Sequence, residues 1–480
     1  MERASGILMP VSALPGRYGI GTLGKNARKF ADFLKAAGQK YWQILPLGPT
    51  SYGDSPYQSF SSYAGNPYFV DPDIMIEEGL LLEKELVFNK NEDPRKIDYG
   101  FLYETRFEML EKASKRAYEK YPEEIKRFED ENAWVRPYAE FMAVKSSNGM
   151  KSPKEWTVRA YDGSMSGTYR LFVFIQFEFY RQWDALKRYV NGLGIKIIGD
   201  VPIYVAYDSA EVWAEPEQFA LDSDNLPVEV SGVPPDYFSK TGQLWGNPLY
   251  NYERMQQDGY SWWIRRIGGA SRLYDVIRID HFRGFASYWS VPAEETTAIN
   301  GKWIEGPGMK LVGVLTSWFH DTKFIAEDLG ILTPDVTQLL KDSGLPGMKV
   351  LQFAFDGDPE NANLPHNYTE NCVCYTGTHD NDTLAGWLES ATEEELDFAK
   401  KYAGLNTGEG YARGIIRLGM TSPARLFVAP LADYLGLGNE ARINTPGTLG
   451  GNWTWRAIET DINTELAAEI AELTERYGRM

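Results

Sequence analysis

Short apolar runs recur along the whole chain, and each ends in glycine, proline or a charged residue. Several are nearly continuous rather than alternating apolar and polar, which is typical of strands buried on both faces of a parallel sheet. The pattern predicts eight strands, within residues 6–10, 41–49, 195–205, 276–280, 323–330, 348–355, 372–380 and 425–435.

Helical patterns lie between several of these runs, at residues 25–38, 169–194, 333–344 and 391–404. Eight strands that alternate with helices predict an α/β fold, a (β/α)8 TIM barrel. An open, doubly wound sheet is the alternative that the alternation leaves.

Two stretches are too long to be simple connections. Residues 70–168 are polar, charged and helix-prone, and we expect a helical insertion there. Residues 207–260 are rich in proline, glycine and aromatic residues, and so long a loop is more often functional than idle. We expect residues 1–480 to form a single catalytic barrel that carries both insertions.

Composition narrows the ligand class. The net charge of −18 argues against nucleic acid or an anionic membrane as the main partner, and it favours a neutral ligand. The 14% of aromatic residues suits sugar rings, although a large core would also explain it. The first residues lack the shape of a signal peptide, no apolar run reaches the roughly 20 residues of a membrane helix, and Cys372 and Cys374 share one strand face as buried thiols. We expect a cytoplasmic protein.

Acidic residues gather where the predicted strands end. These residues are Asp200, Asp280, Glu327, Asp328 and Asp380. Strand ends are often polar, but in a (β/α)8 barrel the carboxyl ends of the strands carry the chemistry. Two of the acids also adjoin His281 and His379, and the chain has only four histidines. We therefore expect a carboxylate cluster at one rim of the barrel.

Such a cluster supports either a metal site or glycoside chemistry. Arg278 stands two residues before Asp280, so both side chains leave the strand on the same face. A guanidinium there opposes metal binding, and we expect it to lower the pKa of Asp280 and keep it ionised. Glu327 would need a raised pKa to donate a proton, and its apolar flanks favour that.

Residues 19–24 form the pattern G-x-G-x-x-G, which suggests a dinucleotide site. Pro10 and Pro15 interrupt the approach, and no acidic residue follows the second strand to bind a ribose. These glycines are therefore better explained as shaping a loop.

Eight segments together resemble one family. They read YWQILPLGPT, GDSPYQSFSSYAGNP, GDVPIYV, DYFSKTGQLWGNPLY, RIDHFRG, AEDLG, GTHDNDT and NTPGTLGGNW, in that order. In these segments, and over essentially its whole length, the chain closely resembles the amylomaltases, or 4-α-glucanotransferases, a branch of the α-amylase clan.

The resemblance implies a role for each matching residue. Asp280 matches the nucleophile, Glu327 the general acid/base and Asp380 the third carboxylate. The residues that match the lining of the subsite where the bond breaks are Tyr57, Asp200, Arg278 and His379. Those that match positions holding the glucan or covering the site are Tyr52, Asp236, Gln243 and Trp245. We expect Asp328 and Asp382 only to support loops.

The implied reaction is double displacement with retention, for which the carboxyl groups of Asp280 and Glu327 should lie about 5–5.5 Å apart. Expected partners are maltodextrins, amylose and starch-type α-1,4-glucans, with no organic cofactor, metal, nucleic acid or membrane. The chain leaves no room for the C-terminal β-sandwich typical of α-amylases, which favours transfer over hydrolysis. A retaining hydrolase and a non-catalytic glycan-binding protein are the alternatives, and both a monomer and a weak dimer stay open.

Overall fold

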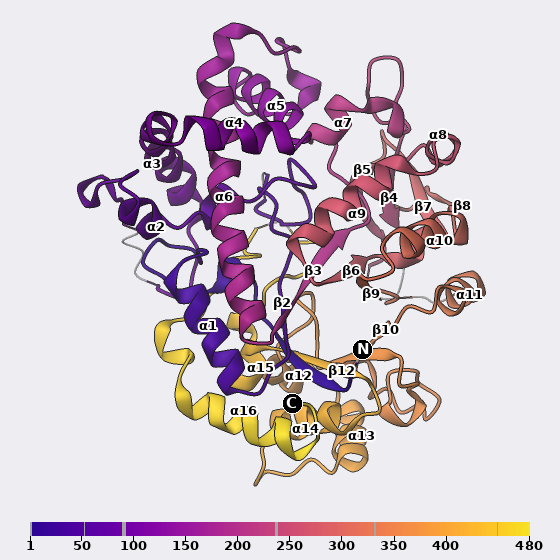
Figure 1. The fold of residues 1–480 in the computed structure, drawn as a ribbon. Helices are drawn as coiled ribbons and strands as arrows, with labels where there is room; N and C mark the ends of the chain where they lie inside the picture. Colours follow the sequence, from indigo (N-terminus) through magenta and orange to yellow (C-terminus); the bar gives the residue numbers. More distant parts are fainter. Residues whose placement is uncertain (1, 52, 89–92, 236–238, 331–332, 449) are drawn as a thin grey trace.

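The computed structural model describes residues 2–51, 53–88, 93–235, 239–330, 333–448 and 450–480 (Figure 1). Eight parallel strands form one sheet in the order β10-β11-β12-β1-β2-β3-β6-β9. Along the chain they are β1 (Ala4–Leu8), β2 (Tyr41–Gln43), β3 (Lys196–Pro202), β6 (Val276–Asp280), β9 (Lys323–Ala326), β10 (Gly347–Val350), β11 (Cys372–Tyr375) and β12 (Leu426–Pro430). All eight predicted strands are present, and the predicted barrel is confirmed.

The sheet curls until its two outer strands meet. The N–H of Ala326, at the end of β9, donates to the carbonyl of Pro346, just before β10, at 2.9 Å. All eight strands therefore point the same way around one axis, and their carboxyl ends form one rim.

Helices surround this sheet, as Figure 1 shows for α1, α6 and α16 on one side. They are α1 (Lys25–Ala36), α6 (Ser166–Gly192), α9 (Ser261–Leu273), α10 (Met309–Trp318), α11 (Pro334–Ser343), α13 (Glu393–Ala403), α14 (Tyr411–Thr421) and α16 (Thr464–Arg476). Shorter helices are α7 (Ala210–Ala214), α8 (Tyr252–Gln257), α12 (Leu384–Ser390) and α15 (Leu431–Leu435). In α1 the buried Ala27, Phe30, Ala31 and Leu34 recur at three- and four-residue steps, which turns one face to the barrel.

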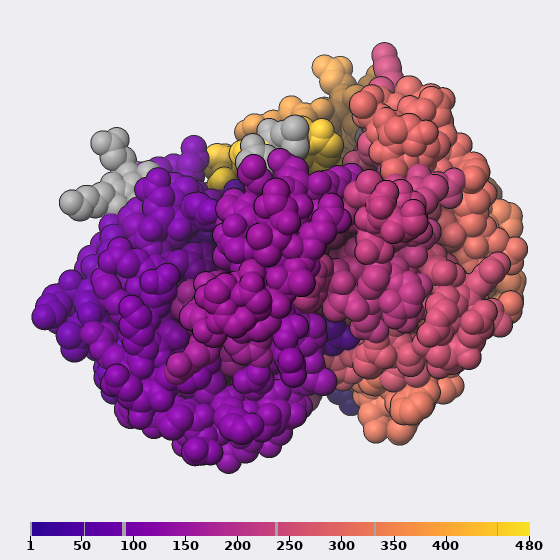
Figure 2. All heavy atoms as spheres, turned by 90° about the horizontal axis from the view of Figure 1, so that it is seen from above, coloured from indigo at the N-terminus to yellow at the C-terminus, as the bar shows by residue number. Residues whose placement is uncertain are grey.

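Between β2 and α6 the chain forms α2 (Pro72–Glu77), α3 (Tyr99–Lys120), α4 (Pro122–Glu131) and α5 (Val135–Ser147). The ammonium group of Lys145 on α5 is buried and pairs with Asp208, after β3, at 2.5 Å. In Figure 2 the purple surface of these helices adjoins the pink surface of the segment after β3. This ion pair fastens the helical insertion to one side of the rim. Its standing as a separate subdomain stays a prediction.

A second, antiparallel sheet lies beside the barrel, with strand order β5-β4-β7-β8. Its strands are β4 (Glu229–Val233), β5 (Gln243–Pro248), β7 (Ser287–Pro292) and β8 (Lys302–Glu305). The sequence prediction treated 207–260 as a loop and overlooked β7 and β8. These strands are only four to six residues long, and none shows the strict alternation of apolar and polar residues by which a strand is recognised in sequence.

The two cysteines are placed as expected. Cys372 and Cys374 are both buried, unpaired thiols, as the C-x-C spacing predicted. Among the helices that the structure describes, none is long and apolar enough to cross a membrane.

A buried arginine, Arg479, joins several segments at the end of the barrel opposite the carboxyl rim. Arg479 has no exposed surface, and its guanidinium donates to the carbonyls of Met420, Ala4 and Ser422 at 2.7, 2.9 and 3.0 Å. Burial lowers its pKa to about 10. One side chain therefore joins β1, the end of α14 and the segment before β12.

Replacing this arginine should destabilise the protein. Arg479→Ala removes one donor from each of three carbonyls, of which Met420 and Ser422 keep a bond from Arg3, and it leaves a buried cavity. We expect a loss of about 2–4 kcal/mol, seen as a lower unfolding temperature in calorimetry at a fixed scan rate. Arg476→Ala is the matched control, because Arg476 is 54% exposed and forms only a surface pair with Glu472. Its change should stay below about 0.5 kcal/mol, and equal effects of the two variants would contradict the role of Arg479.

Candidate active site

The carboxyl groups of Asp200, Asp280 and Glu327 lie close together on or just after the neighbouring strands β3, β6 and β9. Strands β3 and β6 pair with Pro202 opposite Asp280, and β6 and β9 pair with Ile279 opposite Ala326. Glu327, the next residue after β9, therefore lies beside Asp280, and its N–H donates to the carbonyl of Ile279 at 3.0 Å. The sheet itself sets the spacing of these acids.

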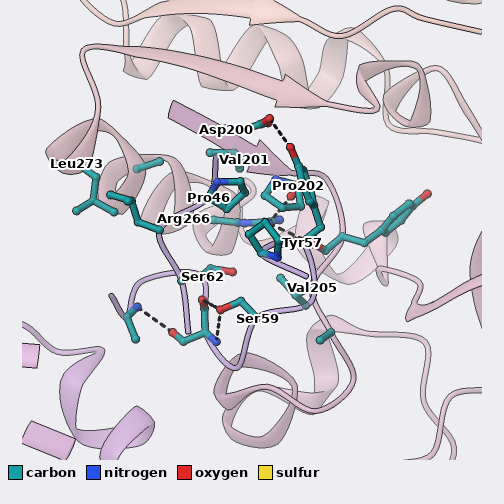
Figure 3. A pocket seen from close by; sticks show the side chains of 18 of the residues that line it. Pro46, Tyr57, Ser59, Ser62, Asp200, Val201, Pro202, Val205, Arg266 and Leu273 are labelled. Atoms are coloured by element: carbon teal, nitrogen blue, oxygen red, sulfur yellow. Dashed lines mark hydrogen bonds between the residues drawn. The ribbon is translucent and has the colours of Figure 1, made fainter. Parts of the chain in front are cut away.

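A buried arginine joins two of the three acids. Nη1 of Arg278 donates to Oδ2 of Asp200 at 2.6 Å and to Oδ1 of Asp280 at 2.9 Å. Arg278 and Asp200 are only 3% and 2% exposed. The hydroxyl of Tyr57 donates to the same Oδ2 of Asp200 at 2.8 Å (Figure 3). A continuous polar chain therefore runs from Tyr57 to Asp280.

The pKa of Asp280 corrects one expectation. Burial raises it to about 6, and this outweighs the opposing effect of Arg278. The prediction that Arg278 holds this pKa below its ordinary value is therefore wrong in its net direction. Sequence shows the neighbouring cation but not the loss of water around the carboxylate.

Glu327 is held at the same rim by backbone donors. The N–H groups of His281 and Leu329 donate to its two carboxylate oxygens at 2.6 and 2.7 Å. Glu327 is 8% exposed, and burial together with the charge of Asp280 raises its pKa to about 8 against these donors and Arg278. The raised pKa expected for Glu327 is confirmed, and of the two carboxyl groups Asp280 ionises first.

His281 shapes the loop that links these two acids. Its φ of 52° is left-handed, which turns the chain into a short helix over Phe282–Phe285. This turn lets the N–H of Phe282 donate to the carbonyl of Glu327 at 2.9 Å. The imidazole packs edge-on against Trp245 with ring centres 4.7 Å apart, and burial lowers its pKa to about 3. His281 is therefore a neutral spacer.

Asp380 lies five residues beyond the end of β11, and its side chain is 43% exposed. Asn444 donates to its Oδ1 at 2.6 Å, and Nε2 of His379 lies 3.3 Å from the same oxygen. Arg442 donates to its backbone carbonyl at 2.7 Å. Neither Asn444 nor Arg442 was singled out from sequence, although Asn444 opens the quoted segment 444–453.

An aromatic wall joins Asp380 to the other acids. The rings of Tyr57 and His379 stack with centres 5.0 Å apart, and Trp453 lies 5.9 Å from each. Tyr57 also bonds to Asp200, so this wall borders the carboxylate cluster on the side of Asp380. Trp453 was also missed, although it closes segment 444–453; only its aromatic type, among fourteen tryptophans, could have signalled it.

The structure places two of the four expected covering residues. Gln243 and Trp245 lie on β5, and Trp245 donates to the side-chain oxygen of Gln243 at 3.3 Å. Tyr52 and Asp236 fall outside the described residues. Asp328 and Asp382 support loops as expected, since Asp328 accepts from the N–H of Met348 at 2.7 Å and Asp382 pairs with Arg442.

A small cavity lies behind this site. It has a volume of about 50 Å³ and is lined by residues that include Tyr57, Asp200 and Arg266 (Figure 3). Ligand sites usually measure roughly 300–1,000 Å³, so this cavity is too small to hold a glucan segment. No group of three or more His, Cys, Asp or Glu side chains in the described ranges is arranged to hold a metal ion.

A (β/α)8 barrel with carboxyl groups clustered at adjoining strand ends, where the pKa of Glu327 is raised above that of Asp280, defines the class of barrel enzymes that act on glycosidic bonds. The sequence profile described as 4-alpha-glucanotransferase matches residues 9–460. The chain belongs to that family and is an enzyme of that activity, which confirms the resemblance seen in its motifs.

Individual relatives agree over full length. The 4-alpha-glucanotransferase of Clostridium butyricum is 49% identical over 98% of this chain and 100% of its own. That of Thermus thermophilus is 46% identical over 99% of each chain. Among solved structures, the amylomaltase from Streptococcus agalactiae in complex with acarbose superimposes with a TM-score of 0.97 at 40% identity, covering both chains completely.

Proposed function

We propose that this enzyme moves α-1,4-glucan segments from a donor maltodextrin to the 4-hydroxyl of an acceptor glucan or glucose, with retention. The observation that supports this most is the pair Asp280 and Glu327. They sit on adjacent strand ends, and the pKa of Glu327 is the higher of the two. One carboxylate and one carboxylic acid are what a retaining glycosyl transfer needs.

In the first half-reaction, a carboxylate oxygen of Asp280 attacks the anomeric carbon. The bond from that carbon to the leaving 4-oxygen breaks as Glu327 gives this oxygen its proton. The products are a glucosyl ester on Asp280 and a shortened glucan. In the second half-reaction, the 4-hydroxyl of an acceptor gives its proton to Glu327 and attacks the same carbon, which frees Asp280.

The surrounding residues support these steps. Arg278, itself held by Asp200, fixes one oxygen of Asp280 and leaves the other for attack. The backbone donors of His281 and Leu329 fix the orientation of Glu327.

The remaining residues would contact the sugar. Asp380 would accept hydrogen bonds from sugar hydroxyl groups, and His379 would donate to them. Tyr57 and Trp453 offer flat faces to the apolar side of the ring. Tyr52, Asp236, Gln243 and Trp245 would hold or cover the rest of the glucan.

Hydrolysis differs from transfer only in what attacks the ester. Trp245 on β5 packs against His281, the residue after Asp280, and we assign Trp245 the task of excluding water until a sugar enters. This arrangement, together with the family, favours transfer over an α-amylase-type hydrolase.

Purified maltotriose tests the activity. We expect glucose and a ladder of longer maltodextrins, with the total number of reducing ends constant, because transfer makes one bond for each bond it breaks. Chromatography by chain length and a reducing-end assay on the same samples measure this. Rising reducing ends without longer products would show a hydrolase instead.

The same assay tests the nucleophile. Asp280→Asn should lose roughly a thousandfold or more of turnover while still binding maltodextrin, because the amide cannot form the ester. Asp397→Asn makes the same chemical change in an exposed ion pair on α13 and should leave turnover intact. Retained turnover in Asp280→Asn would refute the assignment.

The pH dependence of kcat/KM should be bell-shaped. Asp280 must be ionised, so the rate should fall as pH drops through about 6, and Glu327 must be protonated, so it should fall again above about 8. α-Maltosyl fluoride is the matched donor, because fluoride leaves without a proton.

With that donor the alkaline limb of kcat/KM should disappear and the acidic limb should stay. An alkaline limb shared by maltotriose and the fluoride would speak against Glu327 as the proton donor.

A further inference from the structure

The second sheet carries an exposed tryptophan, Trp303. Trp303 sits on β8, an edge strand of the second sheet, and is 43% exposed. The ring of Trp289 meets it edge-on at 5.2 Å, and the guanidinium of Arg283 lies over its ring at 4.2 Å. None of the roles assigned above uses Trp303 or Trp289.

The tryptophan pair is held rigidly. Trp289 and Trp303 stand directly opposite each other in the β7–β8 register. The indole N–H of Trp289 donates to the carbonyl of Ala298 at 2.8 Å, and a Cβ on Gly301 would come within 2.2 Å of that nitrogen. The indole therefore occupies a space that only glycine leaves open. A ring fixed in this way loses little entropy when a ligand packs on it.

The end of β8 is also fastened to the catalytic loop. The N–H groups of Gly306 and Gly308 donate to the carbonyls of Ala286 and Phe285, each at 2.8 Å. Phe285 ends the short helix that begins two residues after Asp280. The position of Trp303 is therefore set relative to the nucleophile rather than by a free loop.

Arg283 shows on which side of the site the pair lies. It follows Phe282, whose N–H binds the carbonyl of Glu327, and the charge of Glu327 acts on its guanidinium. Ser287 at the start of β7 donates to Asp335 on α11 at 2.9 Å, which closes the same side. The proton donor faces the leaving oxygen, so the departing and entering glucans lie on the side of Glu327.

We propose that Trp303, steadied by Trp289 and Arg283, is a stacking platform for glucose units of the acceptor that lie beyond the unit receiving the new bond. A flat indole packs against the apolar face of a pyranose ring, and the guanidinium of Arg283 supports the Trp303 ring from one face. The platform favours longer acceptors over glucose, which is too short to reach it. This inference rests on the proposed transferase function.

Acceptor length separates this role from a general one. With α-maltosyl fluoride as a common donor, Trp303→Ala should raise the acceptor KM for maltohexaose about tenfold, within the range of one aromatic contact. It should leave the KM for glucose, and fluoride release without an acceptor, unchanged. Trp303→Phe should lie between the two.

Trp318→Ala is the matched control. Trp318 is 65% exposed but ends α10, from which the chain enters β9 at the end of the barrel opposite the carboxyl rim. It should change neither KM. Trp303→Leu repeats the test without a flat ring if Trp303→Ala is unstable.

The outcomes are distinguishable. Wild-type protein that releases fluoride but extends neither acceptor would overturn the proposed transferase function. Wild-type protein that transfers normally, while Trp303→Ala and Trp303→Leu change both acceptors equally or change neither, would overturn the platform alone.

Discussion

The site depends on one buried cation, the guanidinium of Arg278 between Asp200 and Asp280. A charge taken out of water is costly unless opposite charges and hydrogen bonds compensate it, and here both partners lie within 2.9 Å. Asp200 faces Arg278 directly in the β3–β6 register, so pairing of the strands and pairing of the charges are the same event. A shift in register would separate the ions and displace Asp280, which makes the barrel's hydrogen bonding and its chemistry mutually dependent.

Burial and neighbouring charges give two chemically similar side chains, Asp280 and Glu327, different pKa values. Both Asp280 and Glu327 lose solvation, but only Asp280 touches the cation, whereas Glu327 is exposed to the negative charge of Asp280. The same low-polarity rim therefore keeps one carboxyl group more acidic than the other. Removing Arg278 would leave Asp280 and Glu327 as two buried acids competing for ionisation, and the proposed distinction between nucleophile and proton donor would weaken.

The sequence predicted those features that depend on residues close together along the chain. The eight strands and the acids that end them are local features, and they were found because each apolar run carries its own signal. Asn444, Arg442 and Trp453 meet Asp380 and Tyr57 only after the whole barrel has closed, so no spacing marks them. The strands β7 and β8 form a hairpin, and they were missed because each is short and lacks a strict alternation of apolar and polar residues. The direction of the Asp280 pKa failed because a neighbouring arginine is visible in sequence and the removal of water is not.

The segment from β6 to β8 carries several of the groups discussed above. Within residues 276–305 it supplies Asp280, the His281 N–H that orients Glu327, and the strand bearing Trp303. In the proposed mechanism, one continuous stretch thus connects Asp280, which would hold the intermediate, to the side from which an acceptor would arrive. Because β7 and β8 are fixed to one another and to the catalytic loop by backbone hydrogen bonds, little ordering is needed when a sugar binds. A transferase must favour a sugar hydroxyl over water at the moment the ester forms, and the proposed acceptor surface, carried by the same segment as Asp280, would meet that requirement.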